Sequence, residues 1–147
     1  MTRKTVLVVD DNSGNRTILT TALEHAGYRV FAAADGPEAL EKAHWDRLDL
    51  VLLDLMMPGP DGWEVRGALA ADPFTRDVPV LLVTAYDEVV DPDRFAAGNF
   101  AGLLRKPIGT RALVESVRAL IGPPTPAEDA AGTGSSDSRS GAESEGA

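Results

Sequence analysis

The chain has 147 residues, of which 44% are hydrophobic and 25% charged, a length and composition that predict one domain with a sizeable core. It contains no cysteine, which excludes a disulfide framework, a thiolate metal site and a cysteine nucleophile. The net charge is −9 and no basic stripe occurs, so we expect no direct binding of nucleic acid.

The first apolar run, residues 6–9, follows Arg3 and Lys4 and is too short for the core of a signal peptide. No later run approaches the ~18–20 apolar residues that span a bilayer. We therefore expect a soluble, cytoplasmic protein without membrane association.

Short apolar runs alternate with helical patterns along the chain. Runs that are continuously apolar and rich in β-branched residues predict strands buried on both faces at 5–9, 51–53 and 80–83. Weaker strand patterns cover 28–33 and 101–104. Apolar residues at helical spacing predict a helix from about Asn12–Ser13 to Gly27, and others over 37–44, 62–71, about 88–97 and 110–121.

The composition changes at Pro123. Residues 123–147 include twelve Pro, Gly or Ser, five acids and one base, and lack Val, Ile, Leu and aromatic residues. Such a segment buries too little apolar surface to offset its ordering entropy. We predict a folded domain over 1–122 and a disordered acidic tail over 123–147. The alternative, a linker, has no output domain in this chain to which it could attach.

Alternating strands and helices predict an α/β fold, with right-handed crossovers and a parallel sheet covered by helices on both faces. In such sheets the chemistry lies beyond the carboxyl ends of the strands. Asp10 and Asp11 follow the first predicted strand, Asp54 the third, Thr84 the fourth and Lys106 the fifth. The second strand ends in alanines, as an outer strand can. We expect the five polar residues to converge.

Three neighbouring carboxylates repel one another unless a cation neutralises them. Mg²⁺ prefers carboxylate and carbonyl oxygens and is commonly completed by phosphate. A lysine beside it suits a phosphoryl group, so the set predicts a Mg²⁺-dependent phosphoryl site in which one carboxylate can be the nucleophile. Taken singly, Asp10 reads as a helix cap and Lys106 as a surface charge; only their joint placement is specific.

The sequence resembles the receiver domain of response regulators, in the chemotaxis-regulator-like superfamily. The matching segments are VVDDN at 8–12, LDLMMPGPDG at 53–62, PVLLVTA at 79–85 and RKPI at 105–108. The resemblance extends over residues 5–121. It implies a flavodoxin-like (βα)5 fold with strand order 2-1-3-4-5. It also implies a two-component phosphorelay protein, here of the stand-alone type, and not an enzyme beyond its own phosphorylation and slow autodephosphorylation.

The resemblance assigns a role to each matching residue. Asp54 would accept the phosphoryl group from a phosphohistidine, which switches protein–protein interactions. Mg²⁺ would be held by Asp11, Asp54 and the backbone carbonyl of Met56, with Asp10 acting mainly through water. Lys106 would pair with a phosphoryl oxygen.

Thr84 would move toward the phosphate as the switch, and the Lys106–Pro107 bond is expected to be cis, as in relatives. One position departs from the family: Leu103 stands where many receivers carry Tyr or Phe. Phe100 or Tyr86 is the candidate to replace that aromatic ring.

Two surfaces are expected to bind partners. The first would dock a sensor histidine kinase or a histidine phosphotransfer protein, and includes Asn12, Asn15, Arg16, Leu19 and Pro107. The second would contact an unknown downstream effector protein, and includes Val89, Phe95, Arg105 and Arg111. Both assignments rest on fold analogy.

Two other functions remain open. An aspartate-nucleophile phosphohydrolase usually carries a second Asp two residues after the nucleophile, where this chain has Met56. A pseudo-receiver that is not phosphorylated would act as an interaction module only, but such a module needs none of Asp10, Asp54 and Lys106.

Overall fold

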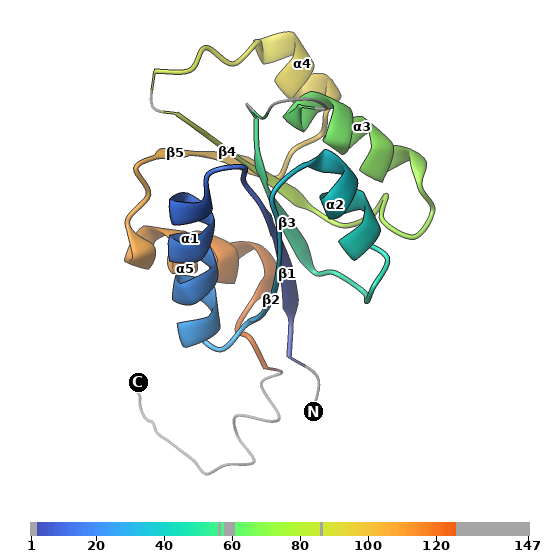
Figure 1. Ribbon diagram of the computed structural model, residues 1–147. Helices are drawn as coiled ribbons and strands as arrows, with labels where there is room; N and C mark the ends of the chain where they lie inside the picture. Colours follow the sequence, from blue (N-terminus) through green and yellow to red (C-terminus); the bar gives the residue numbers. More distant parts are fainter. Residues whose placement is uncertain (1–2, 56, 58–60, 86, 126–147) are drawn as a thin grey trace.

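The computed structural model describes residues 3–55, 57, 61–85 and 87–125. Strands and helices alternate along this part of the chain (Figure 1). In order they are β1 (Thr5–Val9), α1 (Ser13–His25), β2 (Arg29–Ala33), α2 (Gly36–Lys42), β3 (Leu50–Asp54), α3 (Gly62–Ala71), β4 (Val80–Ala85), α4 (Pro92–Ala97), β5 (Gly102–Lys106) and α5 (Thr110–Ile121).

The five strands form one parallel sheet in the order β2-β1-β3-β4-β5, as predicted. The register pairs Val9 with Leu53, Asp54 with Val83, and Ala85 with Lys106. Because all strands run the same way, their carboxyl ends meet at one edge of the sheet. That edge carries the polar residues that the sequence places at the ends of four of the strands, β1, β3, β4 and β5.

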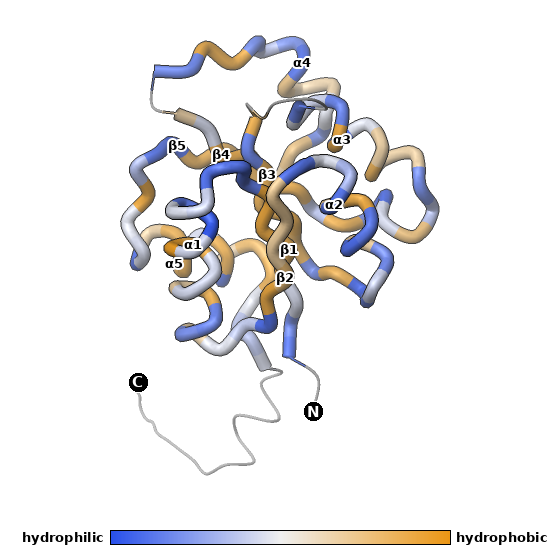
Figure 2. The backbone as a smooth tube through the Cα atoms, in the orientation of Figure 1, coloured by the Kyte–Doolittle hydropathy of each residue, from blue (hydrophilic) through white to orange (hydrophobic). Residues whose placement is uncertain are grey.

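Helices cover both faces of the sheet, α1 and α5 on one and α2 and α3 on the other (Figure 1). Most residues in the middle of the sheet are hydrophobic (Figure 2). Alternate residues of β1 go to different faces: Leu7 packs with Val65 and Leu69 of α3, whereas Val8 packs with Leu23 of α1. Each face therefore has its own apolar core.

The predicted helix at 88–97 is shorter in the structure, because α4 begins at Pro92. Proline disfavours helical backbone at the residue before it and is well suited to the first helical position. Asp91 stands before it as the N-cap, and its side chain accepts from the backbone N–H groups of Asp93 and Arg94. The prediction of helix over 88–91 was wrong for this local reason.

Other boundaries differ by a few residues. α2 ends at Lys42, so His44 follows the helix that was expected to contain it. At the far end of the domain, Pro124 packs on Gly27 and its carbonyl accepts from Lys4 N at 2.8 Å. The first residues assigned to the tail are thus in contact with the domain, and residues 126–147 lie outside the described residues.

Candidate functional site

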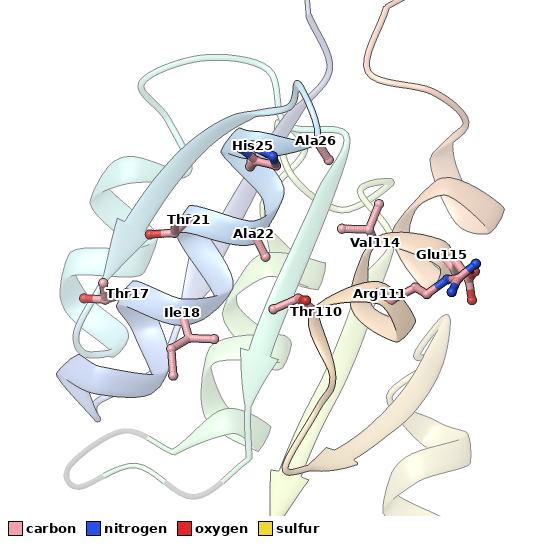
Figure 3. Close-up of a pocket in the computed structure, with 10 residues that line it drawn as sticks. All are labelled: Thr17, Ile18, Thr21, Ala22, His25, Ala26, Thr110, Arg111, Val114 and Glu115. Atoms are coloured by element: carbon pink, nitrogen blue, oxygen red, sulfur yellow. The ribbon is translucent and has the colours of Figure 1, made fainter. Parts of the chain in front are cut away.

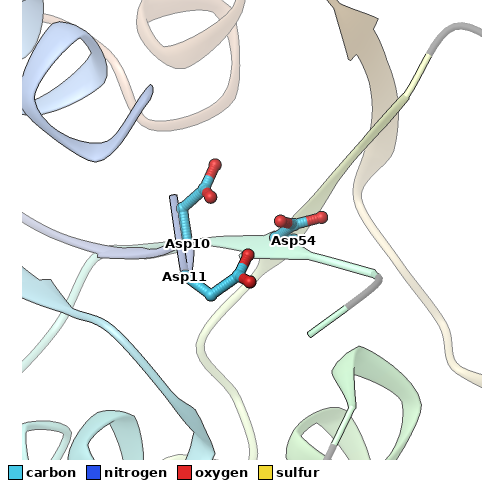
Figure 4. A group of neighbouring side chains, drawn as sticks. All are labelled: Asp10, Asp11 and Asp54. Atoms are coloured by element: carbon cyan, nitrogen blue, oxygen red, sulfur yellow. The ribbon is translucent and has the colours of Figure 1, made fainter. Parts of the chain in front are cut away.

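Three carboxylates meet at the carboxyl edge of the sheet. Asp10 and Asp11 follow β1 and Asp54 ends β3 (Figure 4). One oxygen of each lies within 4.8 Å of the others. Asp10 is 1% exposed and Asp54 5%, whereas Asp11 is open to solvent. Two buried acids beside an exposed third form a cluster with an accessible side.

Lys106 joins the cluster from the end of β5. Its Nζ lies 2.9 Å from Asp10 Oδ2 and 3.2 Å from Asp54 Oδ2. Burial lowers the pKa of Lys106, but hydrogen bonding to Asp10 and attraction to both carboxylates outweigh burial, so the pKa lies above its ordinary value. Because one ammonium faces three acids, the cluster retains negative charge to attract a cation.

Thr84, in β4, completes the set of strand ends. Its side chain is fully buried, and its hydroxyl has no hydrogen-bond partner among the described residues. A buried hydroxyl without a partner carries a desolvation penalty that a ligand oxygen could remove. The five residues predicted to converge lie at the ends of four adjacent strands.

The loop between β1 and α1 is held by bonds to Asp10. Asn12 N donates to Asp10 Oδ1 at 2.9 Å, and Arg16 Nη1 donates to the Asp10 carbonyl at 2.7 Å. The Asn12 side chain also caps α1 by accepting from Asn15 N. Asn12 and Arg16, expected at a docking surface, therefore also hold this loop, a role that the sequence reading did not identify.

Gly62 brings α3 against the backbone beside Asp54. Its N–H donates to the Leu55 carbonyl at 2.9 Å. A Cβ at this position would lie 2.6 Å from the Asp54 carbonyl oxygen. Asp61, before it, forms a capping box with Glu64. The absence of a side chain here allows α3 to begin beside the end of β3.

Leu19 is not on the surface where it was expected. It is 6% exposed and belongs to the core beneath α1, because it lies on the face of that helix that packs on the sheet. Its neighbour Ile18 is 53% exposed. The expected docking surface therefore offers Ile18, and not Leu19, as its exposed apolar side chain.

Two hollows meet at Ile18. A small one of about 100 Å³ also contacts Asn15, Lys106 and Pro107, beside the acidic cluster. A larger, mostly apolar groove of about 680 Å³ runs between α1 and α5 (Figure 3). The two hollows share Ile18, and only the smaller one is lined by Lys106, whose bond to Pro107 is cis as expected.

Phe100 does not replace the missing aromatic side chain near Thr84. Ala101 N bonds to Val80 O, so Phe100 lies at the other end of β4, about 13 Å from Thr84 at ~3.3 Å per strand residue. It packs instead against Trp63 and Phe95. Tyr86, the other candidate, lies outside the described residues, as does Met56 with its expected carbonyl ligand.

The carboxylates suit a hard divalent cation. Carboxylate oxygens are preferred ligands of Mg²⁺, and Mg²⁺ usually keeps several waters and binds through one or two carboxylates. The exposed Asp11 leaves such waters accessible, while the buried Asp10 and Asp54 supply charge that Lys106 only partly neutralises. The donor set therefore fits Mg²⁺.

Comparison with known proteins agrees with this arrangement. Residues 6–118 match the family model of the response regulator receiver domain. The polar-differentiation response regulator DivK of Brucella anthropi is 33% identical over 119 residues, which are 81% of this chain and 97% of DivK. The chain is also 43% identical to the response regulator PleD of Caulobacter vibrioides over 115 residues. That match covers 78% of this chain but only 25% of PleD, so the chain spans about a quarter of that relative.

A solved structure of another response regulator has the same fold. The structure of the chemotaxis response regulator CheY4 of Vibrio cholerae superposes with a TM-score of 0.75 at 32% identity, and the match covers 81% of this chain and 99% of CheY4. In the part of the chain that the structure describes, no helix is long and apolar enough to cross a membrane. On its sequence and its fold, the chain belongs to the receiver domain family of the response regulators of two-component signalling.

Proposed function

We propose that the chain is a phosphoacceptor in a two-component phosphorelay and that Asp54 takes the phosphoryl group from a phosphohistidine of a partner protein. A carboxylate oxygen of Asp54 would bond to phosphorus while the phosphorus–nitrogen bond breaks and the histidine leaves. The observation that carries the proposal is the placement of Lys106 Nζ, 3.2 Å from Asp54 and 2.9 Å from Asp10. A cation fixed beside the acceptor can meet the charge that develops on the transferred group.

Asp10, Asp11 and Asp54 would hold Mg²⁺, together with the carbonyl of Met56. When bound, the ion would supply positive charge next to the transferred phosphoryl oxygens. Lys106 would exchange its bond to Asp54 for one to a phosphoryl oxygen. The Thr84 hydroxyl, which is buried and has no partner among the described residues, would donate to a second phosphoryl oxygen.

The phosphodonor would dock along α1. Pro107 and Ile18 are exposed and line the small hollow that Lys106 also lines. The groove between α1 and α5 continues this apolar surface (Figure 3). A helix of a histidine kinase or phosphotransfer protein, with an apolar stripe flanking its histidine, fits such a surface.

Phosphorylation would change the contacts with an effector protein by adding negative charge at Asp54. A phosphoryl group adds about −1.5 to −2 charge and strong acceptor oxygens at the end of β3. Asp54 itself is fixed at the end of the central strand β3. The response would change contacts with an effector protein on the face that includes β5.

Intact-mass spectrometry tests the proposal. We expect that incubation with Mg²⁺ and a small acyl phosphate adds one phosphate mass to the wild type and none to Asp54→Asn. Asp77→Asn, which changes an exposed acid beyond the other end of β4, should label as the wild type does. Lys106→Met should label at least tenfold more slowly, since it lacks the fixed cation. An unlabelled wild type, alongside a receiver that labels, would exclude the phosphoacceptor role.

A further inference from the structure

Arg66 is a buried cation far from the acidic cluster. It projects from α3 and is only 7% exposed. Its Nε donates to the Gly98 carbonyl at 2.7 Å, and its guanidinium lies 5.9 Å from the centre of the Phe100 ring. Its Nη1 is buried without a hydrogen-bond partner, and no acid among the described residues forms an ion pair with it. Buried arginines are almost always paired with an anion.

Burial lowers the pKa of Arg66, the direction expected of a guanidinium that has lost water without gaining an anionic partner. The Gly98 carbonyl satisfies one of its five donors. The remaining donors have more capacity than the surrounding protein uses, so the position is suited to an external acceptor.

A hollow of about 280 Å³ lies beside Arg66, between α3 and α4. Its lining residues are Trp63, Arg66, Gly67, Ala70, Arg94, Ala97 and Gly98. None of them is acidic, and two are arginines. Small residues keep the hollow open, and a Cβ at Gly67 would meet no atom within 4 Å. The Arg94 guanidinium lies at the rim, 4.5 Å from the centre of the Trp63 ring.

We propose that this hollow binds a small oxyanion of the phosphate or carboxylate type, with Arg66 as its buried ligand and Arg94 as its ligand at the rim. Guanidinium groups present parallel donors that match such oxygens and form short, strong, charge-assisted bonds. The neighbouring hollow, which Arg66 shares with Arg76, is less suited because Asp77 lines it. The site is separate from the phosphorylation site and does not depend on it.

Trp63 provides the readout. Trp45 is 58% exposed and contacts Phe31, so Trp45→Phe leaves a single indole, which lies in the hollow. We would titrate this protein with pyrophosphate and, separately, with citrate in EDTA, using NaCl at matched ionic strength as reference. A saturable change in Trp63 emission beyond the NaCl curve is expected with at least one of the two anions. Tighter binding of pyrophosphate would indicate a ligand of the phosphate type, and tighter binding of citrate one of the carboxylate type.

Substitutions then locate the site. Arg66→Met should weaken binding at least tenfold and Arg94→Met at least threefold, whereas Arg76→Met, a matched loss of charge outside this hollow, should bind as the parent does. Lys106→Met should also keep the titration, which separates this site from the acidic cluster. If circular dichroism shows that Arg66→Met is unfolded, the titration of Arg94→Met tests the proposal, because Arg94 is exposed. Titrations that follow the NaCl curve, that are unchanged by Arg94→Met, or that are lost in Lys106→Met would overturn the proposal.

Discussion

Gly62 shows how one missing side chain fixes the start of a helix beside Asp54. A methyl group there would lie 2.6 Å from the Asp54 carbonyl oxygen and 2.7 Å from Leu55 Cα, and both are backbone atoms that cannot turn away. We therefore expect Gly62→Ala to lower the free energy of unfolding by about 1–3 kcal/mol, the usual effect of overpacking. Urea unfolding followed by circular dichroism measures the loss.

Gly67 is the matched control in the same helix. A Cβ there meets nothing within 4 Å. Alanine in an exposed helix interior is favoured over glycine by roughly 0.5–1 kcal/mol, so Gly67→Ala should leave stability unchanged or raise it. Equal losses in the two variants would mean that the loss in Gly62→Ala does not come from the contact of its new Cβ with the backbone of Asp54 and Leu55.

The site residues could be predicted because each follows a strand. Asp10, Asp54 and Lys106 are at the carboxyl ends of strands recognisable from their apolar runs, and a parallel sheet brings such ends together. Leu19 was predicted to lie on the surface but is buried, whereas the neighbouring Ile18 is exposed. Helical spacing locates the apolar face of α1, but it does not show which of two adjacent apolar residues lies at its edge. Arg66 could not be foreseen at all: its burial depends on where α3 meets α4.

At the scale of helices, an N-cap stabilises either the whole fold or its own helix, depending on whether that helix contributes buried residues. Asp91 caps α4, which has no buried residue, whereas Asp35 caps α2, which buries Ala39. Loss of an N-cap costs about 0.5–2 kcal/mol. Asp35→Ala should lower global stability by that amount, while Asp91→Ala should mainly speed amide hydrogen exchange within α4, which can open locally. A large fall in the urea midpoint of Asp91→Ala would contradict the local opening of α4.

His44 links the end of α2 to the end of α3. Its ring contacts the Leu40 carbonyl and the Asp72 carboxylate and stacks on Phe74. The backbone bond to Leu40 and then Asp72 raise the pKa of His44 above 6.5. Among the described residues, Arg47 is a further charged group near this contact, and its guanidinium lies 5.7 Å from the centre of the Phe74 ring.

A raised pKa in the folded state gives stability that is full below pH 6.5 and lost as pH rises through the folded value. Stability of the wild type should therefore decline slightly from pH 6 toward pH 8, the effect being small because both groups are well exposed. His44→Gln should remove this component of the pH dependence, as measured by urea unfolding at each pH. A wild type whose stability rises over this interval would refute the assignment.

In the whole molecule, the two apolar cores and the polar edge depend on the same strands. β1 gives Leu7 to one core and Val8 to the other and then ends at Asp10. This alternation was predictable from continuously apolar runs. The start of α4 was not, because the helical spacing of residues 88–97 predicts a longer helix, whereas Pro92 disfavours helical backbone at the residue before it. The fold and the convergence of the site residues could be predicted from the apolar runs of the strands. The start of α4 was predicted wrongly because it depends on the local preferences of proline.

Since the acidic cluster is buried on one side and retains negative charge, Mg²⁺ should stabilise the whole fold. A ligand that binds only the folded state adds about 2.7 kcal/mol at a hundred times its dissociation constant. We expect thermal melts in MgCl₂ to shift upward relative to EDTA with KCl at matched ionic strength. Asp11→Asn, which changes the exposed member of the cluster, should lose most of the shift, whereas Glu115→Gln on α5 should keep it. A Mg²⁺ shift of equal size in both variants would mean that the ion acts on the general surface charge and does not bind specifically at the three carboxylates.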